Sequence, residues 1–339
     1  MGKRVYKFLI NKFFSAFIPL FFTLFFIASI IFFITIARFT SYLSLNFWEL
    51  GEIFTYLLPK IIIYTLPVSF FVSIAIATFS MSKENENIVL FSLGYSPKKI
   101  ASPYFTLALF TSLFLIINVV FILPVSKQLY KNFLEIKKLE AKINIKPTEF
   151  GQRFSDWMVF INKADEQGYK DIVLYNQKGK KETLILANDA KLSRQKGVLN
   201  LSLKNGKTFY ITDKEIRQID YGKMEINNFV TAEKLRNAGV LEYWIKSLTD
   251  KKRAKDFSFL LLTALFPLVS YLFAISIATV HIRHDKARVY PFLFAKVIAY
   301  YALSVIFAKT YPFIGLFVIS LGFYAFSKYL FSKKVLKRF

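Results

Sequence analysis

Six long stretches that carry no charge, or a single lysine, dominate this chain of 339 residues. Each is close to the roughly 20 apolar residues that a helix needs to cross a hydrocarbon layer about 30 Å thick. A polar insert, residues 127–256, separates the third stretch from the fourth and holds 17 of the 22 acidic residues. The pattern predicts three transmembrane helices, a domain outside the bilayer and three more transmembrane helices. The apolar stretches cover residues 13–37, 61–82, 100–126, 257–280, 289–308 and 310–327.

Basic residues flank these stretches unevenly. The two termini and the loops after the second and fourth stretches hold 15 lysines and arginines, whereas the other short segments hold only Arg38, Lys60 and Lys309. Basic residues stay on the cytoplasmic face of a membrane. Both termini are therefore expected to be cytoplasmic and the insert to lie outside. Because the charge forms rims at the membrane, where anionic headgroups attract it, we do not expect nucleic acid as a partner.

The insert changes its periodicity near Pro147. Residues 127–143 extend the third span as an amphipathic helix, and beyond Pro147 apolar residues alternate with polar ones. The pair Asn205-Gly206 is a signal for a two-residue hairpin turn. Seven to nine short strands in this region predict a small β-sandwich or jellyroll domain. The expected strands include residues 157–162, 171–176, 182–187, 198–204, 207–212, 216–221 and 223–228.

The domain division follows from these patterns. Residues 1–146 are expected to hold the first three spans, residues 147–231 the all-β domain, and residues 232–339 a connecting helix and the last three spans. The connecting segment, 232–256, is predicted either as an amphipathic helix lying at the outer interface or as a plain connector. The helix would present Leu241, Trp244, Ile245 and Leu248 on one face. The chain has no cysteine, so the domain has no disulfide.

Motifs for catalysis are weak. Gly206-Lys207-Thr208 lacks the glycine that a phosphate-binding loop places five residues upstream, so a hairpin is the better interpretation. His281 and His284 have the spacing of zinc ligands on a helix, but they stand in a short basic loop. The predicted spans contain no Asp or Glu, which argues against proton-coupled transport and embedded acid–base catalysis. We predict no catalytic residue, no metal and no cofactor.

The loop between the second and third spans has the pattern of a short helix. Ser82 can cap its start, Gly94 suits a left-handed stop, and Pro97 prevents continuation, which predicts a helix over residues 83–93 parallel to the membrane surface. Such a helix can dock in the groove of a partner, and the alternative is a surface loop without a partner. The predicted contact residues are Glu84, Glu86, Ile88, Phe91, Gly94 and Tyr95.

Three cations lie in or at the ends of spans. Lys296 is inside the fifth stretch, Arg38 follows the first, and Lys309 joins the fifth to the sixth. A cation at such a position either extends to the interface or faces a polar cavity. Together they can receive an anionic, phosphate-bearing amphiphile.

At the loop between the second and third spans the chain resembles the lipopolysaccharide-export permease family LptF/LptG, also called YjgP/YjgQ. That family shows an acidic-Ser-Glu stretch, an apolar run, Gly-x-Ser and then a proline. The corresponding residues here are Glu84-Asn85-Glu86, Ile88-Val89-Leu90, Gly94-Tyr95-Ser96 and Pro103, with Asn85 in place of the usual serine. The order of spans and insert matches as well, so the resemblance covers essentially the whole chain. Residues 149–192 resemble LptF somewhat more than LptG.

The resemblance implies a permease subunit of an ABC transporter in the bacterial inner membrane, with its β domain in the periplasm. Two permeases would pair with a dimer of a cytoplasmic ATPase, which hydrolyses the ATP. Lipopolysaccharide would enter between spans 1 and 5, which carry Arg38 and Lys296, and pass through the jellyroll to a periplasmic bridge protein. Glu86 matches a glutamate that pairs with an arginine of the ATPase, and an LptC-like membrane-anchored subunit is a further expected partner. The alternatives are a mechanotransmitting ABC-associated membrane protein and an envelope lipid-modifying enzyme.

Overall fold

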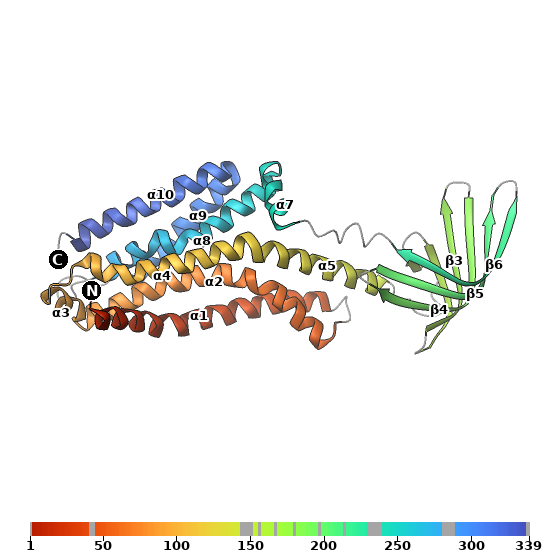
Figure 1. Ribbon diagram of the computed structural model, residues 1–339, viewed down its shortest axis with the longest axis horizontal. Coiled ribbons are helices and arrows are strands. Elements are labelled where there is room, and N and C mark those ends of the chain that lie inside the picture. Colours follow the sequence, from red (N-terminus) through yellow and green to blue (C-terminus); the bar gives the residue numbers. More distant parts are fainter. Residues whose placement is uncertain are drawn as a thin grey trace. The chain divides into compact units, whose positions relative to one another are not determined.

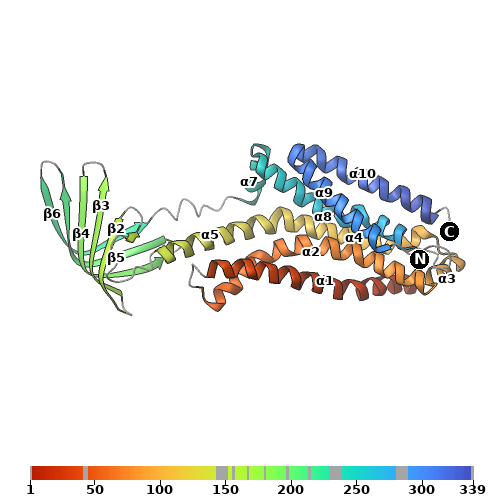
Figure 2. The same ribbon diagram turned by 180° about the vertical axis from the view of Figure 1, so that it is seen from behind.

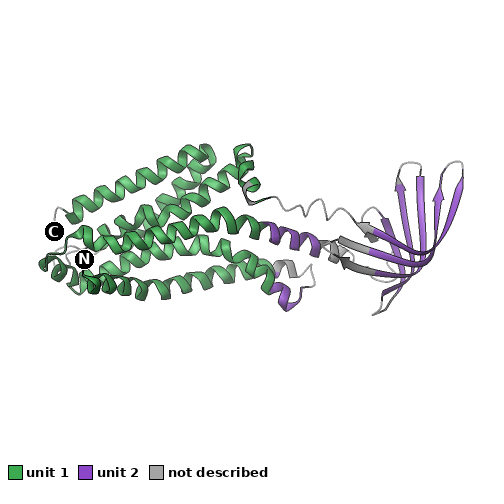
Figure 3. Ribbon diagram, in the orientation of Figure 1, with its two compact units in different colours: residues 1–36, 51–127, 238–339 green, residues 37–50, 128–237 purple. Residues whose placement is uncertain are grey.

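The computed structural model divides the chain into two compact units, which Figure 3 colours separately. The first unit, residues 1–36, 51–127 and 238–339, is helical, and the second, residues 37–50 and 128–237, holds the strands. His281, His284 and the side chain of Arg38 lie outside the described part of the chain. The structure describes residues 2–40, 45–142, 152–154, 157–165, 168–178, 181–195, 198–212, 215–228, 239–279 and 289–336.

Six helices among the described residues are long and apolar enough to cross a membrane, one for each predicted span. Figures 1 and 2 show them from two sides. The predicted helix over residues 127–143 is present as α5, which continues the third span. The helical elements are α1 (Lys3–Thr40), α2 (Phe47–Lys83), α3 (Glu86–Ser92), α4 (Pro97–Ile117), η1 (Asn118–Ile122), α5 (Leu123–Lys142), α7 (Val240–Ile245), η2 (Lys246–Leu248), α8 (Lys251–Ala278), α9 (Val289–Thr310), α10 (Pro312–Phe331) and η3 (Ser332–Leu336).

Helix α8 forms the centre of the helical unit. Its most apolar segment is 83% buried, whereas that of α1 is only 6% buried. On α8, Phe266 is fully buried against Tyr300 of α9, and the Tyr300 hydroxyl donates to the carbonyl of Leu262 at 2.7 Å. Large apolar side chains of α1 point outward. In a membrane protein such a face contacts lipid or a second membrane subunit. Because so little of α1 is buried, few contacts within the described part of the chain hold this helix.

The second unit contains one antiparallel sheet of six described strands, in which sequence neighbours are also sheet neighbours. The prediction of an inserted all-β domain is therefore confirmed. The buried side of the sheet holds Val159, Ile172, Leu174, Leu201 and Leu203. The strands are β1 (Gln152–Phe154), β2 (Trp157–Asp165), β3 (Gly168–Lys178), β4 (Lys181–Gln195), β5 (Val198–Ile211) and β6 (Ile216–Asn228).

A transverse bend crosses strands β2 to β6. At the bend, one residue of each strand is skipped in the pairing with the neighbouring strands, and the skipped residues form a row across the sheet. This row consists of Asn162, Asp171, Asn188, Asn205 and Gly222. Two members of this bend row have left-handed backbones, with φ of 52° at Asp171 and at Asn205. Asparagine and aspartate adopt that conformation more readily than other residues with a side chain. The strands curve strongly in Figure 1, and the bend row gives that curvature a local cause.

The predicted hairpin at Asn205-Gly206 is wrong, because β5 runs through both residues. Gly206 is instead required by close packing. A Cβ at this position would overlap the carbonyl oxygen of Leu186 and the ring of Tyr221. The Tyr221 hydroxyl crosses over the glycine and donates to the Leu186 carbonyl at 2.9 Å. Burial raises the pKa of Tyr221 to about 12, so this donor stays protonated at neutral pH.

The segment before the fourth span is a short helix fixed to the third span. The indole nitrogen of Trp244 on α7 donates to the carbonyl of Val120 at 3.0 Å, within the π-helical turn η1. The predicted single apolar face is divided, since Trp244 is buried whereas Ile245 and Leu248 are exposed. The side chain of Leu241, the fourth residue of that predicted face, lies outside the described part. A π-helical turn leaves a carbonyl available to such an outside donor. The hydrogen bond therefore attaches α7 to η1.

Candidate functional site: the coupling loop

The loop between α2 and α4 contains the predicted helix in a shorter form. Helix α2 runs on to Lys83, Asn85 turns the chain with a left-handed φ of 59°, and α3 begins only at Glu86. The prediction that Ser82 caps the helix is wrong, because Ser82 lies inside α2. The reason is that α2 is continuous with its membrane span and does not stop at the interface.

The predicted stop of this helix at Gly94 is confirmed. Gly94 has a φ of 81°, which a glycine adopts without steric cost. The amide of Tyr95 donates to the carbonyl of Leu90 at 3.0 Å, and that of Gly94 to Phe91 at 3.0 Å. This is the bonding of a left-handed helix end, which satisfies the last carbonyls of α3. The turn sets the direction in which α3 presents its side chains.

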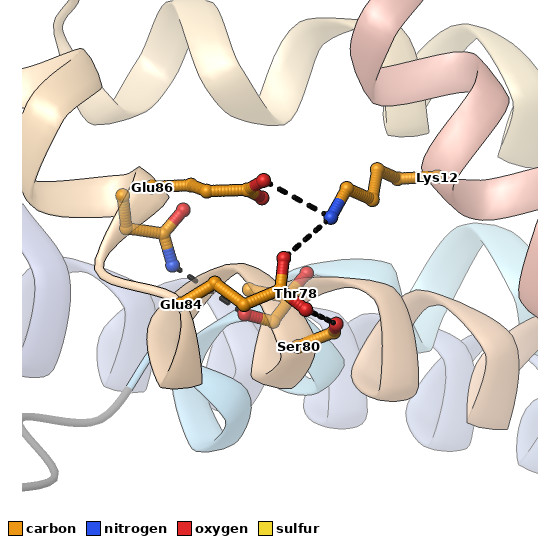
Figure 4. Close-up of polar contacts among 6 residues, drawn as sticks. Lys12, Thr78, Ser80, Glu84 and Glu86 are labelled. Atoms are coloured by element: carbon orange, nitrogen blue, oxygen red, sulfur yellow. Dashed lines mark hydrogen bonds and ion pairs between the residues drawn. The ribbon is translucent and has the colours of Figure 1, made fainter.

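Lys12 of α1 brings the two predicted carboxylates together. Its ammonium donates to Glu84 at 2.7 Å and lies 3.0 Å from an oxygen of Glu86 (Figure 4). The Ser80 hydroxyl donates to the other oxygen of Glu84 at 3.0 Å. The hydrogen bond from Lys12, and then that from Ser80, lowers the pKa of Glu84 below its ordinary value. Lys12 stands 72 residues before Glu84, so no local sequence pattern connects them.

A second set of bonds ties α3 to the ends of α2 and α8. The buried amide of Asn87 donates to the Ser82 hydroxyl at 2.8 Å and to the carbonyl of Thr78 at 3.4 Å. Ser82 in turn donates to the carbonyl of Ala278, the last residue of α8, at 2.9 Å. Buried polar groups that are bonded in this way resist separation, because breaking them would leave them unsatisfied. Helix α3 is thus connected to both the first and the second half of the helical unit.

The apolar residues of α3 divide between an inner and an outer face. Leu90 is buried with Leu9, Met81 and Ile100, and Phe91 and Tyr95 pack against this cluster. Phe91 and Tyr95, which the sequence places in a partner's groove, are partly buried against the start of α1, and their contact with a partner stays a prediction. The outer face consists of Ile88 and Val89, 39% and 55% exposed, and of Leu93 directly after the helix, 67% exposed. Of these three, the sequence prediction included only Ile88.

Lys296 lies in a cavity of about 690 Å³ between α8, α9 and α10. The side chain is 4% exposed, and its ammonium lies 4.3–5.3 Å from the ring centres of three phenylalanines. Ser327 accepts a hydrogen bond from it at 3.4 Å. Cation–π contacts of this kind compensate part of the cost of burying the charge. The three rings belong to Phe273, Phe323 and Phe326.

Lys309 does not join Lys296 in one site. Both residues lie on α9, 13 positions apart by residue number, which corresponds to about 20 Å along a helix. Lys309 is exposed near the end of α9, whereas Lys296 is buried toward its start. Among the described side chains, no group of three or more His, Asp and Glu is placed to hold a metal ion.

A comparison with known protein families identifies the family of the chain. The sequence profile of the family described as lipopolysaccharide export system permease LptF/LptG matches residues 7–333, nearly the whole chain. A comparison with curated proteins finds no match. The profile covers the six spans, the coupling loop and the inserted sheet alike. The chain belongs to the LptF/LptG family of lipopolysaccharide export permeases.

Proposed function

We propose that this chain is a permease subunit of an ABC transporter that extracts lipopolysaccharide from the inner membrane, and that α3 receives the ATPase. The observation that carries the proposal is the division of α3 into two faces. Its inner face and polar side chains are bonded to α1, α2 and α8, whereas Ile88, Val89 and Leu93 are exposed. An exposed apolar face on a helix with firm internal anchors suits a protein groove.

Two sets of contacts, those of Lys12 and those of Asn87 with Ser82, can transmit a movement of α3 to the membrane spans. A displacement of α3 acts on α1 through Lys12 and on α8 through Asn87 and Ser82. Because α1 is mostly exposed and α8 mostly buried, the same force moves α1 more easily. Helix α1 therefore acts as the moving gate. A separate cytoplasmic ATPase dimer supplies the energy, with Glu86 pairing to an arginine of that subunit.

The remaining parts act on the lipid. With both termini cytoplasmic, Arg38 and Lys309 stand toward the outer leaflet, where their charges attract the phosphates of lipopolysaccharide. The cavity around Lys296 accommodates apolar portions of the lipid beside one fixed charge. A second LptF/LptG-type permease completes the cavity. The β domain receives lipopolysaccharide in the periplasm and passes it to a jellyroll bridge protein, with an LptC-like subunit beside it.

The test compares variants of the outer face of α3 in the intact inner membrane. Leu93→Asp places a charge on this face, and we expect the ATPase to be lost when the chain is purified under mild conditions. Ile216→Asp is the matched control, because Ile216 is equally exposed, at 69%, but lies on β6. Retention of the ATPase by both variants would remove α3 from the interface.

A second variant tests the ionic contact of α3 with the ATPase instead of the apolar one. In Glu86→Ala, the ATPase that co-purifies is expected to hydrolyse ATP more slowly, because one of its anchoring charges is gone. If no ATPase co-purifies even with the unaltered chain, the transporter proposal fails. The mechanotransmitter alternative predicts ATPase binding without lipopolysaccharide release from proteoliposomes, and the lipid-modifying alternative predicts neither.

A further inference from the structure

A groove lined by α4, α8 and α10 is separate from the Lys296 cavity, because the two share no lining residue. Its wider part encloses about 490 Å³ and is lined by Lys98, Ser102, Tyr324, Lys328 and Ser332 among others. Much of its lining is apolar, and Lys98, Ser102, Lys328 and Ser332 bring the polar groups, after which we call it the polar chamber. Its volume is that of a small-ligand site. None of the residues lining it is acidic. The chamber therefore has the charge of an anion site.

A narrower apolar part of the groove adjoins the polar chamber. It encloses about 260 Å³ and shares Phe105 and Tyr324 with the chamber as lining residues. Beyond those two, its lining is almost wholly aliphatic, with Leu109, Leu268 and Leu321 among its residues. Leu321 is 65% exposed and Leu109 44%, so this apolar channel is open at the surface of the helical unit.

The helical register places chamber and channel in one line. On α4 the lining residues Lys98, Ser102, Phe105 and Leu109 follow at intervals of three or four, so they share one face. Lys98 stands at the start of α4, close in the chain to α3, and Leu109 lies 11 positions further. That separation is about 16 Å along the helix. One leaflet of the hydrocarbon layer is roughly 15 Å deep, so the groove spans the depth of a single leaflet.

We propose that this groove binds one anionic phospholipid of the cytoplasmic leaflet. The phosphate of the headgroup lies in the polar chamber between Lys98 and Lys328, and an acyl chain follows the apolar channel. Neither lysine has an ion-pair partner among the described residues, so both ammonium groups can donate to a phosphate. Hydroxyls of Ser102 and Ser332 supply additional donors. The choice of leaflet rests on the proposed orientation, with the termini and this end of α4 in the cytoplasm.

The experiment measures lipid binding to the full-length chain by native mass spectrometry. Detergent micelles are supplemented with phosphatidylglycerol or with phosphatidylcholine of the same acyl chains. We expect phosphatidylglycerol to bind at least about tenfold more tightly, since only its net charge is negative. In K98Q/K328Q this preference should fall by about tenfold. The control K3Q/K7Q removes the same charge from exposed positions of α1 and should leave binding unchanged.

A substitution in the channel tests the acyl chain separately. Leu321→Trp fills the apolar channel and should weaken both lipids equally, without altering the preference between them. Equal binding of the two lipids by the unaltered chain, or equal binding by K98Q/K328Q and K3Q/K7Q, would overturn the proposal. A cysteine introduced at Lys328 is unique, because the chain has no cysteine. If it cross-links to protein in native membranes, the groove is a subunit interface and the lipid proposal is wrong.

The outcome is independent of the proposed function. K98Q/K328Q leaves Lys12, Glu84 and the outer face of α3 in place, so ATPase co-purification tests the transporter proposal in the same preparation. If K98Q/K328Q loses its preference for phosphatidylglycerol and still co-purifies with the ATPase, the result supports the lipid site and does not bear on the ATPase interface. Loss of ATPase from the unaltered chain would refute the transporter and leave the lipid site standing.

Discussion

Lys12→Gln is the perturbation that most specifically weakens the link between α1 and the coupling loop. Lys12 and Glu86 lie 3.0 Å apart, with side chains 26% and 28% exposed. Exposed ion pairs contribute about 0.2–1 kcal/mol and hydrogen bonds to charged groups about 1.5–3 kcal/mol. A partly exposed pair falls between these ranges, near 1 kcal/mol. Lys12→Gln also removes the contact with Glu84, which adds less because Glu84 is 51% exposed. The free energy of the link should therefore fall by about 1 kcal/mol, which corresponds to about fivefold in an equilibrium constant.

The assay is lipopolysaccharide release from proteoliposomes that contain the complete transporter, measured together with ATP hydrolysis. Lys12→Gln should lower the lipopolysaccharide released per ATP by up to about fivefold while hydrolysis and ATPase binding stay close to normal. Lys12→Arg keeps a cation and should restore most of the ratio. Lys7→Gln, an exposed lysine of the same helix, is the control and should have no effect.

A double-mutant cycle locates the cause. Thermal unfolding of the isolated chain with Lys12→Gln, Glu86→Gln and both together should show a coupling of about 1 kcal/mol between the two sites. Additive effects in the cycle, or a release ratio in Lys12→Gln equal to that of Lys7→Gln, would refute the link. A parallel loss of ATPase binding would show that Lys12 acts on docking instead of on transmission.

Three further results are expected. Gly206→Ala should destabilise the sheet by about 1–3 kcal/mol through overpacking, which faster limited proteolysis of the β domain would show. Gly222→Ala is the control and should leave the rate of proteolysis unchanged, because a Cβ at Gly222 meets open space. Trp244→Phe should lower the stability of the helical unit in thermal unfolding by about 1–3 kcal/mol because a carbonyl loses its donor, and Trp48→Phe, at a position 84% exposed, should be neutral. The lowered pKa of Glu84 means that its bonds stabilise the chain above its ordinary pKa of 4.5 and that this stabilisation is lost as the pH falls through the lowered value. The difference in unfolding temperature between the unaltered chain and Glu84→Gln should therefore be constant near pH 7 and disappear in acid.

The bend row explains how far the strands could be predicted. On β4 the buried residues are Ile185 and Ala187 before the bend and Ala190 after it, so the alternation changes phase by one residue. Because the alternation of apolar and polar residues is interrupted at the bend, it indicates two short strands where the structure has one bent strand. The predicted ends at residues 162, 171 and 187 accordingly fall on or beside the bend row. The sequence pattern therefore predicts turns at the positions where the strands bend.

The coupling loop was predictable in part for a similar reason. Gly94 needs a left-handed backbone, which is a local property that the sequence reveals. The direction of each side chain of α3 depends on α1, which is distant in the chain. Phe91, predicted to enter a partner's groove, is partly buried against the start of α1, and the exposed Leu93 was overlooked. Lys12 could not be foreseen, because only the packing of α1 beside the loop brings it to Glu84 and Glu86.

The central claim is that the exposed face of α3 contacts the ATPase. A photo-reactive residue at position 93, introduced in living cells and activated in intact membranes, measures that contact directly. Position 90 is the control, because Leu90 is on the same helix but only 8% exposed. We predict an adduct with the ATPase subunit from position 93 and none from position 90. An equal yield from both positions, or no ATPase adduct from position 93, would contradict the account.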